Sequence, residues 1–341
     1  MTTAVVICPG RGTYNATELG YLARNFPDAG LLDTFDAQRA GLGQERLRAL
    51  DGADRFTLSK HTRGDNASGL IYAATYGDFA SIKDDIELVA VTGNSMGWYS
   101  ALACAGAVTP ENGFKIANSM GSFMQEAMIG GQLIYPWVDE NWVPRPALHQ
   151  TLLDLIAEIN ARADHVLSVS IDLGGMLVLA GNEQGLNAFE QAVEPAQERF
   201  PMRLSNHAGF HSALQVPVAA RGRAVLHAAL FGQPDLPIID GRGHIWWPGA
   251  SDPNALWDYT LGHQVTETYD FTAAVTTAAR EFAPDIFIVT GPGTTLGGAI
   301  AQSLIQADWQ CMRNKTDFKE KQDAGPLLVS MGMESQRTLV I

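Results

Sequence analysis

A serine lies between two glycines in the stretch VAVTGNSMGWYSALACAG, residues 89–106. Ser95 follows an apolar run typical of a buried strand and precedes a run typical of a helix, with Gly93 and Gly97 two positions away on either side. A sharp strand-to-helix turn needs such glycines, because Cβ atoms at those positions would collide. The turn presents the hydroxyl at the helix N-terminus, where backbone N–H groups stabilise an oxyanion. The pattern predicts a nucleophilic serine; the alternative is an ordinary turn in which Ser95 caps the helix.

A serine nucleophile needs a base, and histidine is the usual one. His211 lies in SNHAGFHSAL, residues 205–214, where the chain leaves a predicted inserted domain, and such junctions often line a cleft. We take His211 as the first candidate and His207 as the second, while either could be a histidine without a catalytic role. Composition alone does not choose among the eight histidines, which are residues 61, 149, 165, 207, 211, 227, 244 and 263.

The elements that position these residues follow from the apolar pattern. Three short β-type runs, at 3–10, 86–93 and 284–293, each end in a glycine-containing turn followed by a helical pattern. This order is typical of an α/β fold with a parallel sheet, in which ligands bind at the carboxyl ends of the strands. We therefore expect a hydrolase-like parallel-sheet domain with the serine at its carboxyl edge.

The middle of the chain follows a different order, β-α-β-β-α-β, which is that of a ferredoxin-like domain. It predicts a small domain inserted into the large one. The last residues contain KTDFKEKQD and resemble a solvated segment. The expected division is a first part of the large domain at 1–128, the ferredoxin-like insertion at 129–205, the second part of the large domain at 206–305, and a C-terminal tail or lid at 306–341.

Composition excludes several functional classes. The 341 residues include 23 Lys plus Arg and 37 Asp plus Glu, a net charge of −14 that disfavours a nucleic-acid or membrane partner. An anionic substrate would need a local basic patch. No run is long and apolar enough for a membrane span, and MTTAVVICPG lacks the features of a signal peptide, so we expect a cytoplasmic protein. Three widely spaced cysteines suggest neither a disulfide framework nor a metal site.

Six motifs in order make the chain similar to the malonyl-CoA:acyl-carrier-protein transacylase family. The resemblance spans about residues 4–305, from the first motif to the last. It implies a hydrolase-like α/β domain with a ferredoxin-like insertion, and a ping-pong reaction through an acyl-serine. The motifs are CPGRGTY (8–14), TGNSMGWYSALACAGAVT (92–109), KIANSMGSFMQEAM (115–128), AGFHS (208–212), LGHQVTETYDF (261–271) and GPGTTLGGAI (291–300).

The resemblance assigns roles to particular positions. It implies that Ser95 is acylated and that His211 is the base, oriented by a main-chain carbonyl at Gln264 in place of a triad carboxylate. The oxyanion hole would be the backbone N–H groups of Met96 and Arg11. No cofactor would be bound permanently, since the substrates are acyl-CoA or acyl-phosphopantetheine and an acyl carrier protein.

The chain departs from the family pattern at several positions. Asn94 and Trp98 replace a His and a Glu beside the serine, and we interpret both as neighbours without a chemical role. Met120 stands where malonyl-transferring members carry an arginine that binds the malonyl carboxylate. A thioether cannot form that charge-assisted pair. With Phe210, which accompanies unbranched acyl groups in the family, Met120 predicts a pocket for an uncharged acyl group.

The leading hypothesis is therefore an acyltransferase that moves an uncharged, non-malonyl acyl group to an acyl carrier protein. One alternative is a malonyl transferase in which Arg11, where the family usually has Gln, binds the carboxylate. A second is an acyl hydrolase that clears carrier proteins, and a third is a silent docking module. Cations near the cleft would bind phosphopantetheine or an acidic carrier protein; the candidates are Arg203, Arg221 and Arg223.

Overall fold

Two β-sheets organise the chain, and the computed structural model describes all 341 residues. The larger sheet has six strands in the order β11-β10-β1-β2-β7-β8. All neighbouring strands are parallel except β8, which runs antiparallel to β7 at one edge. The prediction of a parallel α/β sheet is confirmed. The strands are β1 (Thr2–Cys8), β2 (Ile86–Gly93), β7 (Ile238–Ile239), β8 (Ile245–Trp246), β10 (Ile286–Val289) and β11 (Leu328–Ser330).

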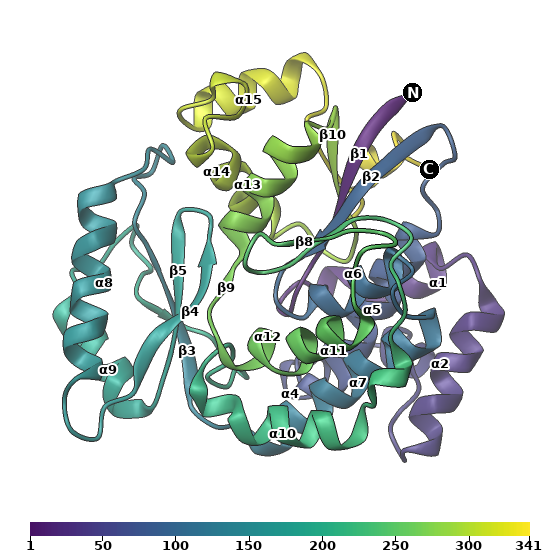
Figure 1. Cartoon of the computed structure of the whole chain (residues 1–341), viewed down its shortest axis with the longest axis horizontal. Helices are drawn as coiled ribbons and strands as arrows, with labels where there is room; N and C mark the ends of the chain where they lie inside the picture. The colour runs from purple at the N-terminus through teal and green to yellow at the C-terminus, as the bar shows by residue number, and fades with distance from the viewer.

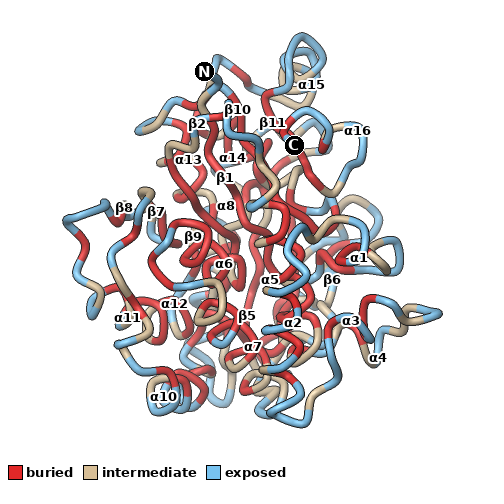
Figure 2. Tube along the Cα trace, turned by 90° about the vertical axis from the view of Figure 1, so that its right-hand side faces the viewer, coloured by how far each residue is buried: buried red, intermediate tan, exposed pale blue.

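Helices lie on both sides of the larger sheet (Figure 1). The central strands β1 and β10 are almost fully buried, so they consist of apolar residues without alternation. Figure 2 shows the buried segments in the middle of the molecule and the exposed ones at its rim. The helices of this domain are α1 (Tyr21–Asn25), α2 (Ala29–Gly41), α3 (Leu47–Asp51), α4 (Leu58–His61), α5 (Gly64–Phe79), α6 (Gly97–Cys104), α7 (Pro110–Ala127), α10 (Val216–Val225), α11 (Pro253–Leu261), α12 (His263–Thr266), α13 (Phe271–Phe282), α14 (Gly297–Gln306), α15 (Lys315–Ala324) and α16 (Glu334–Arg337).

The second sheet belongs to the small domain, at the left of Figure 1. Its strand order, β6-β3-β5-β4, with antiparallel neighbours, is the ferredoxin-like order that the sequence predicts. The short strand β9 (Tyr269–Asp270) adds to the edge, parallel to β4, and leads directly into α13. The other elements are β3 (Gly131–Pro136), α8 (Pro146–Asn160), β4 (Leu167–Leu173), β5 (Met176–Gly181), α9 (Glu183–Ala192) and β6 (Met202–Arg203).

Sequence periodicity explains the packing of the small domain. Helix α8 buries Leu152, Ile156 and Ile159, which lie on one face at spacings of four and three. Leu133 of β3 and Leu179 of β5 belong to the same continuous apolar core as the strands of the large sheet. The two domains are therefore packed together around a shared core, and the cleft between them has fixed walls.

The C-terminal residues are not the solvated tail that their charge pattern suggests. Residues 328–330 form β11, which pairs with β10 at the edge of the larger sheet. Arg337 is buried and forms an ion pair of 2.5 Å with Asp78, whose carboxylate also accepts a hydrogen bond from Tyr21. The apolar run LLVSM supplies the edge strand, and only α15 carries the expected exposed charges. None of the helices combines the length and apolarity needed to cross a bilayer.

Candidate active site

Ser95 lies in the turn between β2 and α6, at the carboxyl edge of the larger sheet. Its φ of 54° is in the left-handed region, which a non-glycine residue adopts only under strong constraint. A Cβ atom on Gly93 would lie 2.3 Å from the carbonyl carbon of Gly97, and one on Gly97 would lie 2.1 Å from the carbonyl oxygen of Cys8. The two glycines thus allow the turn to press against the end of β1, as the sequence pattern predicts.

The side chain of Ser95 meets His211, which lies in the loop between β6 and α10. Ser95 Oγ is 2.7 Å from His211 Nε2, and His211 Nδ1 is 2.6 Å from the carbonyl oxygen of Gln264. A carbonyl only accepts, so Nδ1 carries the proton and Nε2 is free to accept the serine proton. Burial lowers the pKa of His211 to about 4, against a smaller opposing effect of the Gln264 carbonyl. The imidazole is therefore neutral at neutral pH.

Gln264 is itself held in place. Its side-chain nitrogen donates to the carbonyl oxygen of Ser95 at 3.1 Å, and its side-chain oxygen accepts from the hydroxyl of Tyr99 at 3.1 Å. The residue that orients the histidine is thereby tied to the serine turn. This arrangement fixes the tautomer without a carboxylate.

Two backbone N–H groups point to an oxyanion site. Met96 follows the serine at the N-terminus of α6, and Arg11 lies in the loop after β1. Neither backbone N–H donates a hydrogen bond within the chain. Unpaired donors beside a nucleophile can stabilise the negative oxygen of a tetrahedral intermediate.

Ser95 opens into a cavity of about 1050 Å³ between the two domains. Its walls include Arg11 and Asn94 from the large domain, Gln132 and Arg203 from the small domain, and Phe210 from the loop that carries His211. This volume exceeds that of a short acyl group and leaves room for the thioester arm.

The guanidinium of Arg11 is a partly buried charge in the wall of this cavity. One nitrogen, Nη2, donates to the carbonyl oxygens of Thr62 at 3.0 Å and Asn206 at 2.9 Å, while Nη1 is buried without a hydrogen-bond partner. Burial lowers the pKa of Arg11 to about 10, partly offset by Asp65. The guanidinium lies over the ring of Phe210, 5.2 Å from its centroid. No carboxylate lies within 4.0 Å of it, so the chain itself leaves this cation without a counter-ion.

Met120 does not lie where the sequence hypothesis requires it. It is fully buried, does not line the cavity, and packs against α10, where a Cβ atom on Gly222 would lie 2.8 Å from its sulfur. Helix α7 therefore turns this apolar side chain into the core. Met120 is thus not among the residues that line the cavity, whereas Phe210 does line it.

The two other departures beside the serine have different surroundings. Trp98 is fully buried and donates to Thr260 at 2.9 Å, with its ring edge-to-face on Tyr259 at 5.1 Å, so its role is packing. Asn94 lines the cavity, and its side-chain oxygen is buried without a partner. Nothing in the structure gives Asn94 a chemical function.

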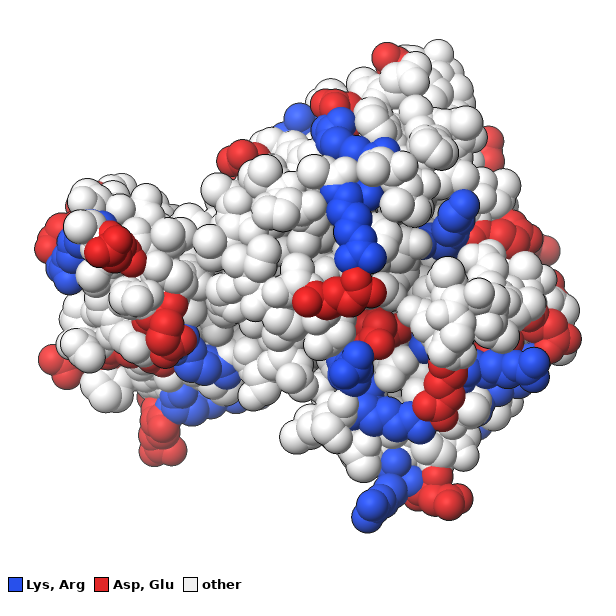
Figure 3. All heavy atoms as spheres, turned by 90° about the horizontal axis from the view of Figure 1, so that it is seen from below, with Lys and Arg blue, Asp and Glu red and all other residues white.

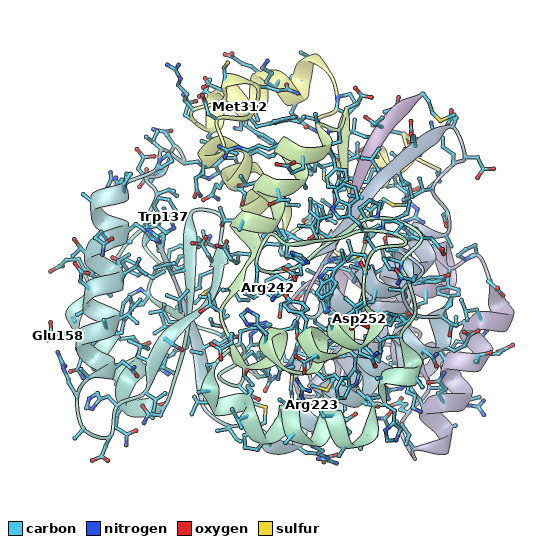
Figure 4. The ribbon with its side chains drawn as sticks, viewed as in Figure 1. Trp137, Glu158, Arg223, Arg242, Asp252 and Met312 are labelled. Atoms are coloured by element: carbon cyan, nitrogen blue, oxygen red, sulfur yellow. The ribbon has the colours of Figure 1, made fainter.

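The three arginines considered for docking are all ion-paired within the chain. Arg203 lines the cavity but forms a bidentate pair with Glu190, with contacts of 2.8 and 2.9 Å. Arg221 pairs with Glu126, and Arg223, labelled on α10 in Figure 4, pairs with Asp258 at 2.8 Å. Acidic and basic side chains are interspersed on the face that Figure 3 shows. Their charges are thus largely balanced locally.

Several polar residues of the cavity wall were not candidates in the sequence, among them Gln132 and Lys315. Gln132 has no local signal, because only the pairing of β3 with its neighbours brings it to the cleft. Lys315 lies in the segment predicted to be a solvated tail, yet it lines the cavity with its ammonium 5.1 Å from the centroid of Trp142.

His207, the second candidate base, also lines the cavity, but its ring forms a hydrogen bond with Gln132 at 2.9 Å and none with Ser95. No cluster of potential metal ligands occurs in the chain.

Comparison with known proteins agrees with these features. The chain is 24% identical over 301 residues to the malonyl CoA-acyl carrier protein transacylase of Salmonella typhimurium, covering 87% of this chain and 92% of that protein. It is 27% identical over 210 residues to the enzyme of the same name from Bacillus subtilis, covering 61% of this chain and 62% of the relative. No family model matches the chain.

Solved structures share the fold over nearly the whole chain. The acyl-carrier-protein S-malonyltransferase of Burkholderia pseudomallei superposes with a TM-score of 0.74 at 21% identity, covering 99% of both chains. A malonyl-transacylase solved in complex with a type II PKS acyl-carrier protein superposes with a TM-score of 0.71 at 19% identity, covering 95% of this chain and 100% of that one. The hydrolase-like fold with a ferredoxin-like small domain is thus shared.

Proposed function

We propose that this chain, which is similar to malonyl CoA-acyl carrier protein transacylases, is a thioester acyltransferase that moves a malonyl group from CoA to an acyl carrier protein. The reaction runs through an acyl-serine at Ser95. It needs no bound cofactor, because the substrates carry the reactive thioester and thiol themselves.

The geometry supports each step of such a reaction. His211 Nε2 takes the proton of Ser95 as the oxygen attacks the thioester carbonyl. The backbone N–H groups of Met96 and Arg11 stabilise the tetrahedral oxyanion. When the C–S bond breaks, the imidazolium returns the proton to the departing CoA thiolate. The thiol of the carrier protein then repeats the sequence in reverse, and the serine is regenerated.

The single observation that carries the malonyl assignment is the guanidinium of Arg11, which lines the cavity that contains Ser95 and has no carboxylate within ion-pair distance. A contrast within the chain supports it. Arg39 is fully buried, and its guanidinium donates to Glu45 O, Asp65 O, Asn66 Oδ1 and Asn118 Oδ1. Arg39 thus serves packing, whereas Arg11 keeps a donor and an uncompensated charge that a carboxylate would satisfy.

This proposal replaces the hypothesis of an uncharged acyl group. That hypothesis depended on Met120 as part of the acyl pocket, and the buried position of Met120 outside the cavity removes its basis. The charge missing from α7 is supplied instead by Arg11 from the loop after β1. A malonyl carboxylate bound there would lie near Phe210, in contact with the Arg11 guanidinium.

The experiment is acylation of the protein by malonyl-CoA and acetyl-CoA, followed by transfer to a carrier protein bearing phosphopantetheine. Intact-mass spectrometry after rapid quenching measures acyl-Ser95 formation, and addition of the carrier protein measures its discharge. We expect malonyl-CoA to react faster and the malonyl group to appear on the carrier. Acyl release to water at the same rate with and without carrier would instead identify a hydrolase.

A further inference from the structure

A buried chain of hydrogen bonds crosses the wall between the small domain and the loop that carries the catalytic histidine. Ser170 Oγ lies 2.7 Å from the carbonyl oxygen of Phe210, and Gln132 Nε2 lies 2.6 Å from Ser170 Oγ. Gln132 Oε1 lies 2.9 Å from His207 Nδ1. Ser170 and Gln132 are both buried, so water does not compete with these bonds.

The donor and the acceptor of each hydrogen bond in this series follow from the bond to the carbonyl oxygen of Phe210. The carbonyl of Phe210 can only accept, so the single proton of the Ser170 hydroxyl is donated to it. The serine oxygen must then accept from the amide nitrogen of Gln132. This orientation leaves the amide oxygen of Gln132 facing His207, and an oxygen acceptor requires a proton on His207 Nδ1.

The tautomer of His207 is therefore fixed, and its Nε2 is a hydrogen-bond acceptor. No group of the chain donates to this nitrogen, although His207 lines the cavity beside Arg11. Protonation would supply a donor instead, but burial and the positive charge of Arg11 lower the pKa of His207 to about 3. At neutral pH the imidazole is therefore neutral, and Nε2 is an acceptor.

The cavity thus offers a cation and a hydrogen-bond acceptor that both lie near one aromatic ring. The guanidinium of Arg11 lies 5.2 Å from the centroid of Phe210, and the imidazole of His207 lies 5.7 Å from it. A plain malonyl group presents only acceptors to this pair, so the imidazole nitrogen would face an acyl group that cannot bond to it. A neutral hydroxyl fits the acceptor, whereas the charge of Arg11 disfavours a cationic donor.

We propose that His207 is a specificity-determining residue that selects acyl groups bearing a hydroxyl in addition to the carboxylate that Arg11 binds. The substrate class is a hydroxylated dicarboxylic acyl thioester, of which hydroxymalonyl is the smallest member. This inference rests on the proposed function, because it takes the acyl group to lie between Arg11 and His207.

The test compares substrates that differ only in the donor. The probes are hydroxymalonyl-CoA against methylmalonyl-CoA, which are similar in size, and glycolyl-CoA against propionyl-CoA, which repeat the comparison without a carboxylate. Acyl-Ser95 formation is measured by rapid quenching for the wild type, His207→Phe and Ser170→Ala. We expect the hydroxylated member to react at least about tenfold faster in the wild type, because only a hydroxyl can donate a hydrogen bond to Nε2 of His207. The ratio should fall to near one in His207→Phe.

Ser170→Ala is the second variant, because it keeps the imidazole and removes only the group that orients Gln132. This variant should partly lower the ratio of the acylation rates of the hydroxylated and non-hydroxylated substrates. An effect on both rates alike cancels in that ratio. Nitrogen NMR of protein labelled at histidine reads the tautomer directly, with His207→Phe assigning the signals. We expect a protonated Nδ1 and a bare Nε2 on His207 in the wild type, and a mixture in Ser170→Ala.

Each outcome bears on a different claim. A wild-type ratio near one in both substrate pairs, or a protonated Nε2, overturns the proposal for His207. A protein that is acylated by acetyl, propionyl and glycolyl groups but by no dicarboxylic group refutes the malonyl assignment alone. In that case the ratio of acylation rates with glycolyl-CoA and propionyl-CoA still shows whether His207 selects for a hydroxyl.

Discussion

Replacing Arg11 by glutamine should convert the enzyme from one that prefers malonyl to one that does not. Arg11→Gln removes the charge but keeps the backbone N–H assigned to the oxyanion hole, so the chemistry at Ser95 is preserved. In the folded chain only Nη2 of the guanidinium is hydrogen-bonded, to Thr62 O and Asn206 O, and no carboxylate of the chain pairs with the charge. The variant therefore tests one contact, between the Arg11 guanidinium and a substrate carboxylate.

The magnitude follows from the burial of that contact. A hydrogen bond to a charged group in a desolvated site contributes about 3 kcal/mol, which corresponds to about 150-fold in rate. The malonyl-to-acetyl ratio of acyl-Ser95 formation should fall by that factor, because acetyl makes no use of the charge. Rapid-quench measurement with both donors gives the ratio, and thermal unfolding of the variant checks that the fold is retained.

Met120→Leu is the matched control. Its side chain is buried outside the cavity, so the substitution should change the rates with both donors equally and leave the ratio intact. An unchanged ratio in Arg11→Gln, or a wild-type preference for acetyl, would refute the reasoning from the unpartnered guanidinium.

Four further predictions concern the catalytic centre. Ser95→Ala should abolish covalent labelling by malonyl-CoA, and peptide mapping that still finds an acylated residue would contradict the assignment. His211→Ala should slow acyl-enzyme formation at least about 100-fold, and in the wild type the acid limb of the pH–rate profile should have its midpoint near 4, since burial lowers the pKa of this histidine to about 4. The same lowered pKa should make the free energy of unfolding decrease as pH falls from the ordinary histidine value towards 4, and His211→Gln should flatten that part of the curve, which denaturant titration measures. Gly97→Ala should lower both activity and melting temperature because its Cβ would meet Cys8 O, while Gly41→Ala, with no atom within 4 Å of its Cβ, should change neither.

Much of the fold and the catalytic pair could be predicted from local sequence. Local residue types determine the strand-to-helix turns, the need for glycines around Ser95 and the β-α-β-β-α-β order. Each of these features depends on neighbours within a few residues. The C-terminal segment is a strand where the sequence predicts a solvated tail. The charged residues of α15 dominate the local composition, and the apolar strand β11 that follows them is short.

The walls of the cavity were decided by the tertiary structure. Residue types around position 120 suggest an apolar acyl pocket, but the orientation of α7 against α10 turns Met120 into the core. Arg11, Gln132 and His207 come from a loop after β1, from β3 and from the loop before α10, and only the packing of the two domains brings them to one cavity. Sequence determines which chemistry each side chain can do. Which charges remain unpaired and which nitrogen carries a proton depend on partners far apart in the chain, because hydrogen bonds and desolvation act through space.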